Sequence, residues 1–162
     1  MKIDIRQANE NDKDGIWEVL STAVEQGNFC IYSYDMSYDD IMNHWQQPNH
    51  DIFVATSDKD GIIGTFYLKP LEVGLSNHVV TGDFIVLGND KSRGAMREMG
   101  NVAIREATNQ GYSSFLIKAI QHNRRVLKVF SELGFHVTGT IPRAYRNKNG
   151  RFLAFVLLIR SL

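Results

Sequence analysis

The chain has little of what cross-links or interrupts a fold: one cysteine, Cys30, and three prolines in 162 residues. A lone cysteine makes neither an internal disulfide nor a cysteine cluster for zinc. Excess charge is also absent, because 18 basic residues balance 18 acidic ones. Proteins that bind nucleic acid by neutralising phosphates usually carry a basic excess, so we expect no nucleic-acid partner.

Long hydrophobic runs are missing as well. No stretch approaches the roughly 18 consecutive apolar residues of a membrane-spanning helix, so we expect no membrane partner. The amino-terminal sequence MKIDIRQANENDKDG is charged from Lys2 and has no apolar signal-peptide core. The five histidines lack the spacing of metal ligands, which argues against a metal cofactor. We therefore predict a cytoplasmic location.

The sequence does contain the 43% apolar and 22% charged residues typical of a globular protein. This length predicts a single domain over residues 1–162. Apolar alternation and short apolar runs predict strands over residues 2–7, 51–58, 61–71, 79–88, 113–120, 136–141 and 152–159. Helical spacing predicts helices over residues 12–24, 37–47, 94–110 and 123–133. The order predicts an α/β fold, a mixed sheet with helices on its faces.

Helix boundaries are marked by capping residues. Asn11 or Asp12 is placed to cap the first helix. Ser37 precedes the second, with Asp40 at the capping-box distance. Asn123 is placed to cap the last helix. These signals fix where the loops between elements begin.

The segment GNDKSRGAMR, residues 88–97, lies between a buried strand and a helix. The unpaired N–H groups of a helix start attract phosphate, and Gly94 lets a loop approach closely. Lys91 and Arg93 add positive charge. On this feature alone, an ordinary solvated helix start is as good an interpretation as a phosphate site.

Several short motifs follow this segment at a joint spacing. They are KSRGAM at 91–96, Gly111-Tyr112, Asn123, and VFSELGF at 129–135. With them the sequence resembles the GNAT superfamily of acyl-CoA-dependent N-acyltransferases, whose signature is Q/R-x-x-G-x-G/A at the strand-to-helix turn. The alignment runs without a gap from Val86 to Phe135. Lys91 replaces the family's Gln or Arg, and Met96 replaces its Gly or Ala.

The resemblance implies a GNAT-like, mostly antiparallel mixed sheet of about seven strands flanked by about four helices. Its fourth and fifth strands splay apart, and the pantetheine arm of the co-substrate acetyl-CoA lies between them. The residues that the resemblance assigns to acetyl-CoA are Phe84, Ile85, Val86, Lys91, Ser92, Arg93, Gly94, Ala95, Met96, Asn123 and Phe130. The Phe84 backbone N–H would bind the thioester oxygen as an oxyanion hole.

A general base is expected because the attacking amine must lose a proton. Many relatives use a glutamate on the fourth strand, a position that maps to Val80 here. Asp83 on the same predicted strand is the substitute we predict, with His78 and Glu72 behind it. The alternative is that Asp83 is a strand-end carboxylate with no catalytic duty.

The leaving thiolate is commonly protonated in this family by a tyrosine of the last helix. Phe130 holds that position here and has no proton to give. Tyr145 is the catalytic acid that we predict in its place, unless another hydroxyl or solvent protonates the thiolate. A further alternative is a chain that binds acyl-CoA without fast turnover.

The residues that bind the amine acceptor are the hardest to predict from the sequence. Tyr32 and Tyr34 belong to an aromatic segment that lines the acceptor pocket in the family, and ordinary packing is the alternative. Arg143, Arg146 and neighbouring cations near the C-terminus suggest an acidic acceptor group or a solvated hairpin, of which we favour the hairpin. Cys30 is expected to be a buried small side chain rather than a nucleophile.

The resemblance thus implies an N-acetyltransferase that moves an acetyl group from acetyl-CoA to a primary amine by direct attack in a ternary complex. The acceptor would be a small molecule, an amino acid or a peptide, and a homodimer is common among relatives. One alternative is an acyl-CoA-binding regulatory module that is catalytically slow or inactive. Another, suggested by Lys91 and Met96, is an interaction domain that no longer binds the cofactor.

Overall fold

A computed structural model describes residues 1–27 and 30–162 of the chain. The helices are α1 (Lys13–Gln26), α2 (Tyr38–Trp45), α3 (Ala95–Asn109) and α4 (Arg124–Glu132). The strands are β1 (Ile3–Gln7), β2 (Asp51–Ser57), β3 (Gly61–Pro70), β4 (Val79–Thr81), β5 (Phe84–Val86), β6 (Ser114–Ile120), β7 (His136–Arg146) and β8 (Phe152–Ser161). Among the described helices, none is long and apolar enough to cross a membrane.

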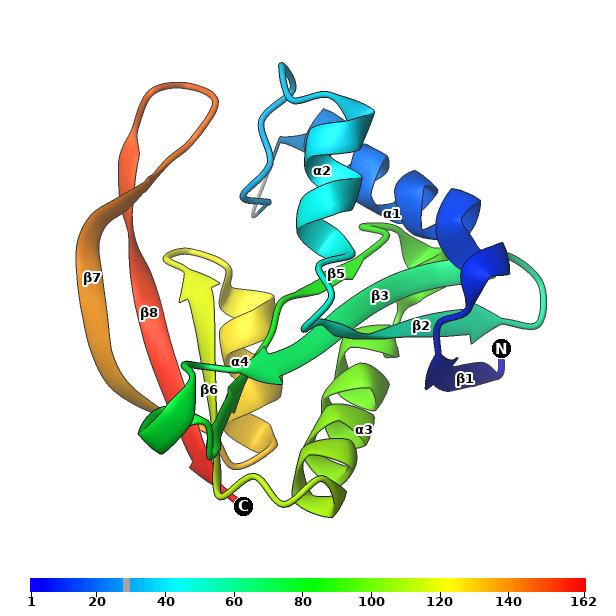
Figure 1. Cartoon of the computed structure of the whole chain (residues 1–162). Helices are drawn as coiled ribbons and strands as arrows, with labels where there is room; N and C mark the ends of the chain where they lie inside the picture. The colour runs from blue at the N-terminus through cyan, green and yellow to red at the C-terminus, as the bar shows by residue number, and fades with distance from the viewer. Residues whose placement is uncertain (28–29) are drawn as a thin grey trace.

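The strands form one open sheet in the order β1-β2-β3-β4-β6-β8-β7, with β5 also paired to β3 (Figure 1). Within the described chain, β4 and β6 are the one parallel pair and the other pairs are antiparallel. This is the mixed, mostly antiparallel sheet with four helices that the sequence analysis predicts.

Two apolar clusters hold the helices to the sheet. One joins α1 and α2 to β2 and β3 through residues such as Leu20, Trp45 and Tyr67. The other joins α3 and α4 to the sheet through residues such as Met99 and Phe130. The sheet therefore carries a helix pair on each side, and the site described below lies where β5 and β6 separate.

The predicted cap residues Asp12, Ser37 and Asn123 are the N-cap residues of α1, α2 and α4, but only the last two make a side-chain cap. The Ser37 hydroxyl accepts from the Asp40 N–H at the start of α2, and Asn123 accepts from the Val126 N–H at the start of α4. Asp12 makes no side-chain cap on α1. Its carboxylate instead binds the Arg6 guanidinium at 2.7 Å, which ties α1 to β1.

The strand predicted over residues 79–88 is divided into β4 and β5, so the sheet has eight strands rather than seven. Lys69 of β3 lies opposite Thr81, and Phe66 lies opposite Phe84, so the register is the same on both sides of the break. The strand is thus bent without a slip in pairing.

Gly82 occupies the bend because the backbone of β3 passes too close for any side chain. A Cβ atom at Gly82 would lie 1.8 Å from the Tyr67 carbonyl oxygen and 3.0 Å from its carbonyl carbon. Apolar runs carry no signal of such a close approach, so the pattern predicts one continuous strand.

The bend opens the sheet. β4 pairs in parallel with Ser114–Leu116 of β6, whereas β5 pairs with β3 on its other side and leaves β6 (Figure 1). The part of β6 beyond Leu116 keeps its pairing with β8. The opening predicted between the fourth and fifth strands is confirmed, and it lies between β5 and the second half of β6.

The backbone groups of β5 that face the opening follow from antiparallel pairing, in which alternate residues turn to opposite edges. The Asp83 carbonyl and the Leu87 N–H both bond to β3, at 3.3 and 2.9 Å. Phe84 and Val86 are out of phase with these residues. Their N–H and carbonyl groups therefore point away from β3, towards the opening.

Candidate active site

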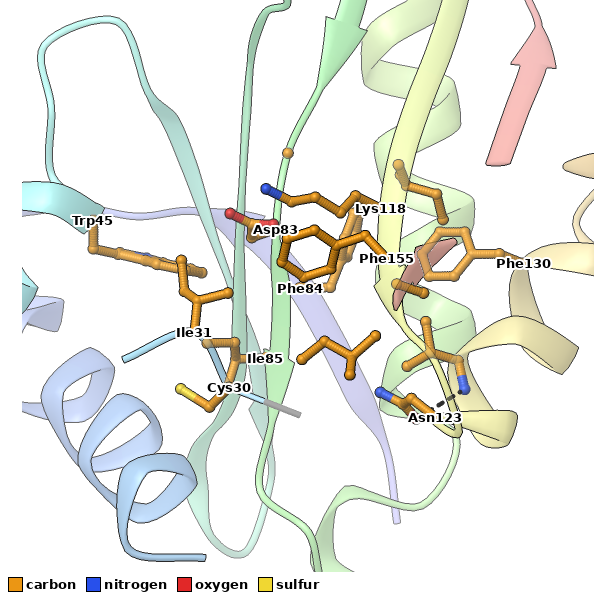
Figure 2. A pocket seen from close by; sticks show the side chains of 15 residues that line it. Cys30, Ile31, Trp45, Asp83, Phe84, Ile85, Lys118, Asn123, Phe130 and Phe155 are labelled. Carbon is orange, nitrogen blue, oxygen red and sulfur yellow. Dashed lines mark hydrogen bonds between the residues drawn. The ribbon is translucent and has the colours of Figure 1, made fainter. Parts of the chain in front are cut away.

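The opening between β5 and β6 is a cleft with a cavity volume of about 70 Å³ (Figure 2). Described residues that line it include Cys30, Ile31, Trp45, Gly82, Asp83, Phe84, Ile85, Lys118, Asn123, Phe130 and Phe155. A neighbouring hollow shares Phe84, Ile85 and Asn123 with the cleft and extends to Val86, Gly88, Met96 and Arg125. Together they form one groove that runs from Asp83 towards the start of α3.

The start of α3 offers backbone donors at the far end of this groove. Gly94 is its N-cap residue, with a left-handed φ of 82°, and the first intrahelical bond is donated by the Glu98 N–H. The four N–H groups of a first turn have no intrahelical partner and stand at the positive end of the helix dipole. Met96 is buried in the core and lines the hollow that reaches this turn.

The loop that precedes α3 is held by its own hydrogen bonds. The buried Ser92 hydroxyl donates to the Leu87 and Asn89 carbonyls, and the Ser92 N–H also donates to the Asn89 carbonyl, so both donors of Ser92 are used within the loop. Arg93 is exposed and lies 3.8 Å from Asp90. The Lys91 side chain lies outside the described part of the chain. Arg125, which the sequence analysis missed, adds a cation at the groove.

Aromatic rings form the inner wall of the cleft. Phe84 meets Phe130 edge to face, with ring centroids 5.1 Å apart. Phe130 is 1% exposed and also packs on Phe135. The predicted residues Phe84 and Phe130 are thus brought together, on an apolar surface that carries no transferable proton.

Asp83 lies at the bend beside Phe84, and its carboxylate has a fixed partner. The Tyr67 hydroxyl donates to Asp83 Oδ2 at 2.5 Å, and the Tyr67 ring stacks on His50 at 3.8 Å between centroids. Burial, followed by the negative charge of Asp83, raises the pKa of Tyr67, so its hydroxyl stays protonated. Sequence reasoning missed Tyr67, because only the pairing of β3 with the bend brings it to Asp83.

The other candidate bases lie elsewhere. His78 and Glu72 are exposed between β3 and β4 and are not among the described residues that line the cleft. Val80 is fully buried in the core. Burial raises the pKa of the Cys30 thiol, which keeps it protonated and agrees with its expected packing role. Asp83 is therefore the carboxylate that the fold brings to the cleft.

A second hollow lies between residues 30–35 and the β7–β8 hairpin, and Tyr32, Tyr34 and Tyr145 line it. The Tyr145 hydroxyl donates to the Cys30 carbonyl oxygen at 3.1 Å, and Tyr32 Oη lies 2.7 Å from His44 Nδ1. Both cavities share Cys30, but Tyr145 does not appear among the described residues that line the cleft of Asp83. Its hydroxyl anchors the segment that separates the two.

Comparisons with known proteins agree with this architecture. The family model for the acetyltransferase (GNAT) domain matches residues 5–154. The N-acetyltransferase aca1 of Schizosaccharomyces pombe is 29% identical over 103 residues, which are 62% of this chain and 49% of that protein. The chain thus spans about half the length of that relative.

Solved structures share the fold. The GCN5-related N-acetyltransferase from Kribbella flavida has a TM-score of 0.87 at 22% identity, covering 99% of this chain and 98% of its own. The phosphinothricin acetyltransferase from Sinorhizobium meliloti, in complex with acetyl-CoA, has a TM-score of 0.85 at 17% identity, covering 100% of this chain and 89% of its own. Because the family model matches residues 5–154, the chain belongs to the GNAT acetyltransferase family.

Proposed function

We propose that this protein is an N-acetyltransferase that moves the acetyl group of acetyl-CoA to a primary amine in a ternary complex. The observation that carries the proposal is the continuous groove between the free edge of β5 and the start of α3, with Asp83 at its other end. A long ligand with an anionic tail and a reactive tip fits a groove of that form. Family membership supports the same activity.

Backbone groups and cations along the groove match the amides and the pyrophosphate of acetyl-CoA. The outward N–H and carbonyl groups of Phe84 and Val86 would pair with the amides of the pantetheine arm as a neighbouring strand does. The first turn of α3, which begins at Ala95, would hold the pyrophosphate, with Arg93 and Arg125 supplying charge. Removal of these contacts would weaken binding of the intact cofactor.

The reaction needs a donor for the oxyanion, a base for the amine and a proton source for the thiolate, and they act in that order. The amine nitrogen attacks the thioester carbonyl carbon, and the Phe84 N–H stabilises the developing oxyanion, a contribution of about 2.7–4 kcal/mol. Asp83, directly or through water, takes the proton that the nitrogen loses. The carbon–sulfur bond then breaks and the thiolate takes a proton. Because the Tyr145 hydroxyl is bonded to the Cys30 carbonyl in the next cavity, we favour solvent as that proton's source.

The experiment that tests this function measures acetyl-CoA binding by calorimetry and free CoA release with a panel of primary amines. We expect binding, and CoA release that depends on the amine. Binding without release for every amine would favour the regulatory-module alternative, which Phe130 motivates. No binding would contradict the proposal altogether. The absence of a metal cofactor, the homodimer and the cytoplasmic location stay predictions.

Gly94→Val should weaken acetyl-CoA binding about 10- to 100-fold, the effect of losing hydrogen bonds to a charged group. A β-branched residue is strained at the φ of 82°, so the first turn of α3 would shift. Calorimetry measures the effect. Gly61→Val is the matched control, because Gly61 has a φ of 72° and equally open surroundings away from the groove. Equal affinity in both variants would contradict the phosphate site.

Tyr145→Phe should raise the acceptor KM about 2- to 10-fold and leave kcat almost unchanged, because it removes one hydrogen bond to the Cys30 carbonyl. Steady-state kinetics at saturating acetyl-CoA separate the two constants. Tyr112→Phe is the control, because Tyr112 is a half-buried tyrosine between α3 and β6 that is not among the described residues lining either cavity. A large fall in kcat with an unchanged KM would instead identify Tyr145 as the catalytic acid.

A further inference from the structure

The cleft holds two groups of opposite charge, the Asp83 carboxylate and the Lys118 ammonium (Figure 2). The other described residues that line it are apolar or uncharged, among them Trp45, Phe84, Phe130 and Phe155. Asp83 is half-buried, whereas Lys118 is exposed, so solvent reaches the ammonium when the cleft is empty. A cavity of this kind selects ligands that match both charges.

Lys118 projects to the side of the sheet away from the α3–α4 core. Its neighbours on β6, Ile117 and Ala119, are buried, and alternation places Lys118 on the opposite face. The ammonium lies 4.9 Å from the centroid of the Phe155 ring. Among the described residues, no carboxylate lies within 4.0 Å of it as an ion pair. The face of the ring attracts the ammonium charge. It does not supply the oxygen acceptors that the three N–H groups of the ammonium can bind.

Only one of the two carboxylate oxygens of Asp83 accepts a hydrogen bond within the described part of the chain. Oδ2 accepts the Tyr67 hydroxyl, and Oδ1 makes no hydrogen bond within the described part of the chain. The hydroxyl therefore fixes the orientation of the carboxylate while leaving an acceptor free towards the cleft. Because Asp83 directly precedes Phe84, an amine at this oxygen would also be next to the N–H proposed for the oxyanion.

We propose that the acceptor belongs to the amino-acid class: a compact molecule whose amine lies at Asp83 and whose carboxylate is bound by Lys118. The inference rests on the proposed N-acetyltransferase function and adds its substrate class. With a simple amine bound, Lys118 would contact only the Phe155 ring and water, whereas the carboxylate of an amino acid would form an ion pair with it. Lys118 is then a specificity-determining residue, and acetylation would turn a dipolar acceptor into an anionic N-acetyl product.

The test compares L-amino acids of graded size with their carboxamides and decarboxylated amines, measuring CoA release. The variants are Lys118→Met, Lys118→Arg and Lys59→Met, the last making the same change in the exposed β2–β3 turn. The wild type should prefer the carboxylates about 10- to 100-fold in kcat/KM, the effect of a charged hydrogen bond. Lys118→Met should abolish this preference, so that its kcat/KM for a carboxylate equals its own kcat/KM for the matching decarboxylated amine. Lys118→Arg should retain part of it, and Lys59→Met all of it.

The outcomes separate this inference from the function on which it rests. CoA release at equal kcat/KM for carboxylates and decarboxylated amines would overturn the inference and leave the N-acetyltransferase standing. A carboxylate preference that survives in Lys118→Met would overturn the role of Lys118. Absence of release with every acceptor would overturn both. Acetyl-CoA affinity measured in each variant shows whether the groove is intact, because Lys118 lies outside its cofactor end.

Discussion

Replacement of Asp83 by asparagine should lower kcat about 100- to 10,000-fold, the range of general-base catalysis. Asparagine keeps the size of the side chain, and its carbonyl oxygen can still accept the Tyr67 hydroxyl, so the bend should persist. An amide accepts no proton from the attacking amine at neutral pH. Acetyl-CoA affinity should not change, because its groups lie along β5 and at the start of α3. Pre-steady-state acetyl transfer together with calorimetry measures both quantities.

Asp58→Asn provides the control for this result, because it makes the same change in the exposed β2–β3 turn. It should leave both kcat and acetyl-CoA affinity at the wild-type values. A fall of less than about threefold in Asp83→Asn would lie far below the range for a general base. Asp83 would then be a strand-end carboxylate, and solvent would take the proton.

Gly82→Ala should destabilise the fold by about 1–3 kcal/mol or more and reduce acetyl transfer sharply. The added methyl would meet the Tyr67 carbonyl oxygen at 1.8 Å, and backbone cannot rotate aside as a flexible side chain does. Relief of this overlap must move β4 or β5 away from β3. That movement would displace Asp83 and the Phe84 N–H together. Urea unfolding gives the free energy of unfolding, and CoA release gives the activity.

Gly139→Ala is the matched control for Gly82→Ala. Gly139 also lies in a strand, β7, and a Cβ there meets nothing within 4 Å. Replacement of glycine by alanine at a compatible position changes stability by only about 0.4–1 kcal/mol. Equal stability and activity in the two variants would show that the bend does not depend on Gly82.

Much of the fold could be predicted from local pattern. The Ser37–Asp40 capping box and the Asn123 cap lie where the sequence places them, because a cap depends on residues three apart. Apolar spacing identified the helices and most strands for the same reason. Asp12 is the exception, since its carboxylate binds Arg6, six residues away, instead of capping α1.

The site was predicted less completely, because most of its chemistry comes from contacts between distant segments. The resemblance placed Phe84 and Gly94 by motif spacing, and both lie along the groove or at its end. No local sequence pattern marks Tyr67 or Lys118 as part of the site. Tyr67 meets Asp83 across β3 and the bend, 16 residues apart, and Lys118 reaches the same cleft from β6. Such pairs depend on strand order and register.

By itself, the sequence determined the alternation of strands and helices, the caps, and the spacing that resembles one acyltransferase family. These features depend on interactions within a few residues, or on motifs read along the chain. Only the tertiary structure decided that the fourth predicted strand bends at Gly82, opens the sheet and turns Asp83 towards Lys118. The physical reason is the close passage of the Tyr67 backbone, a contact between strands that no pattern along a single strand records.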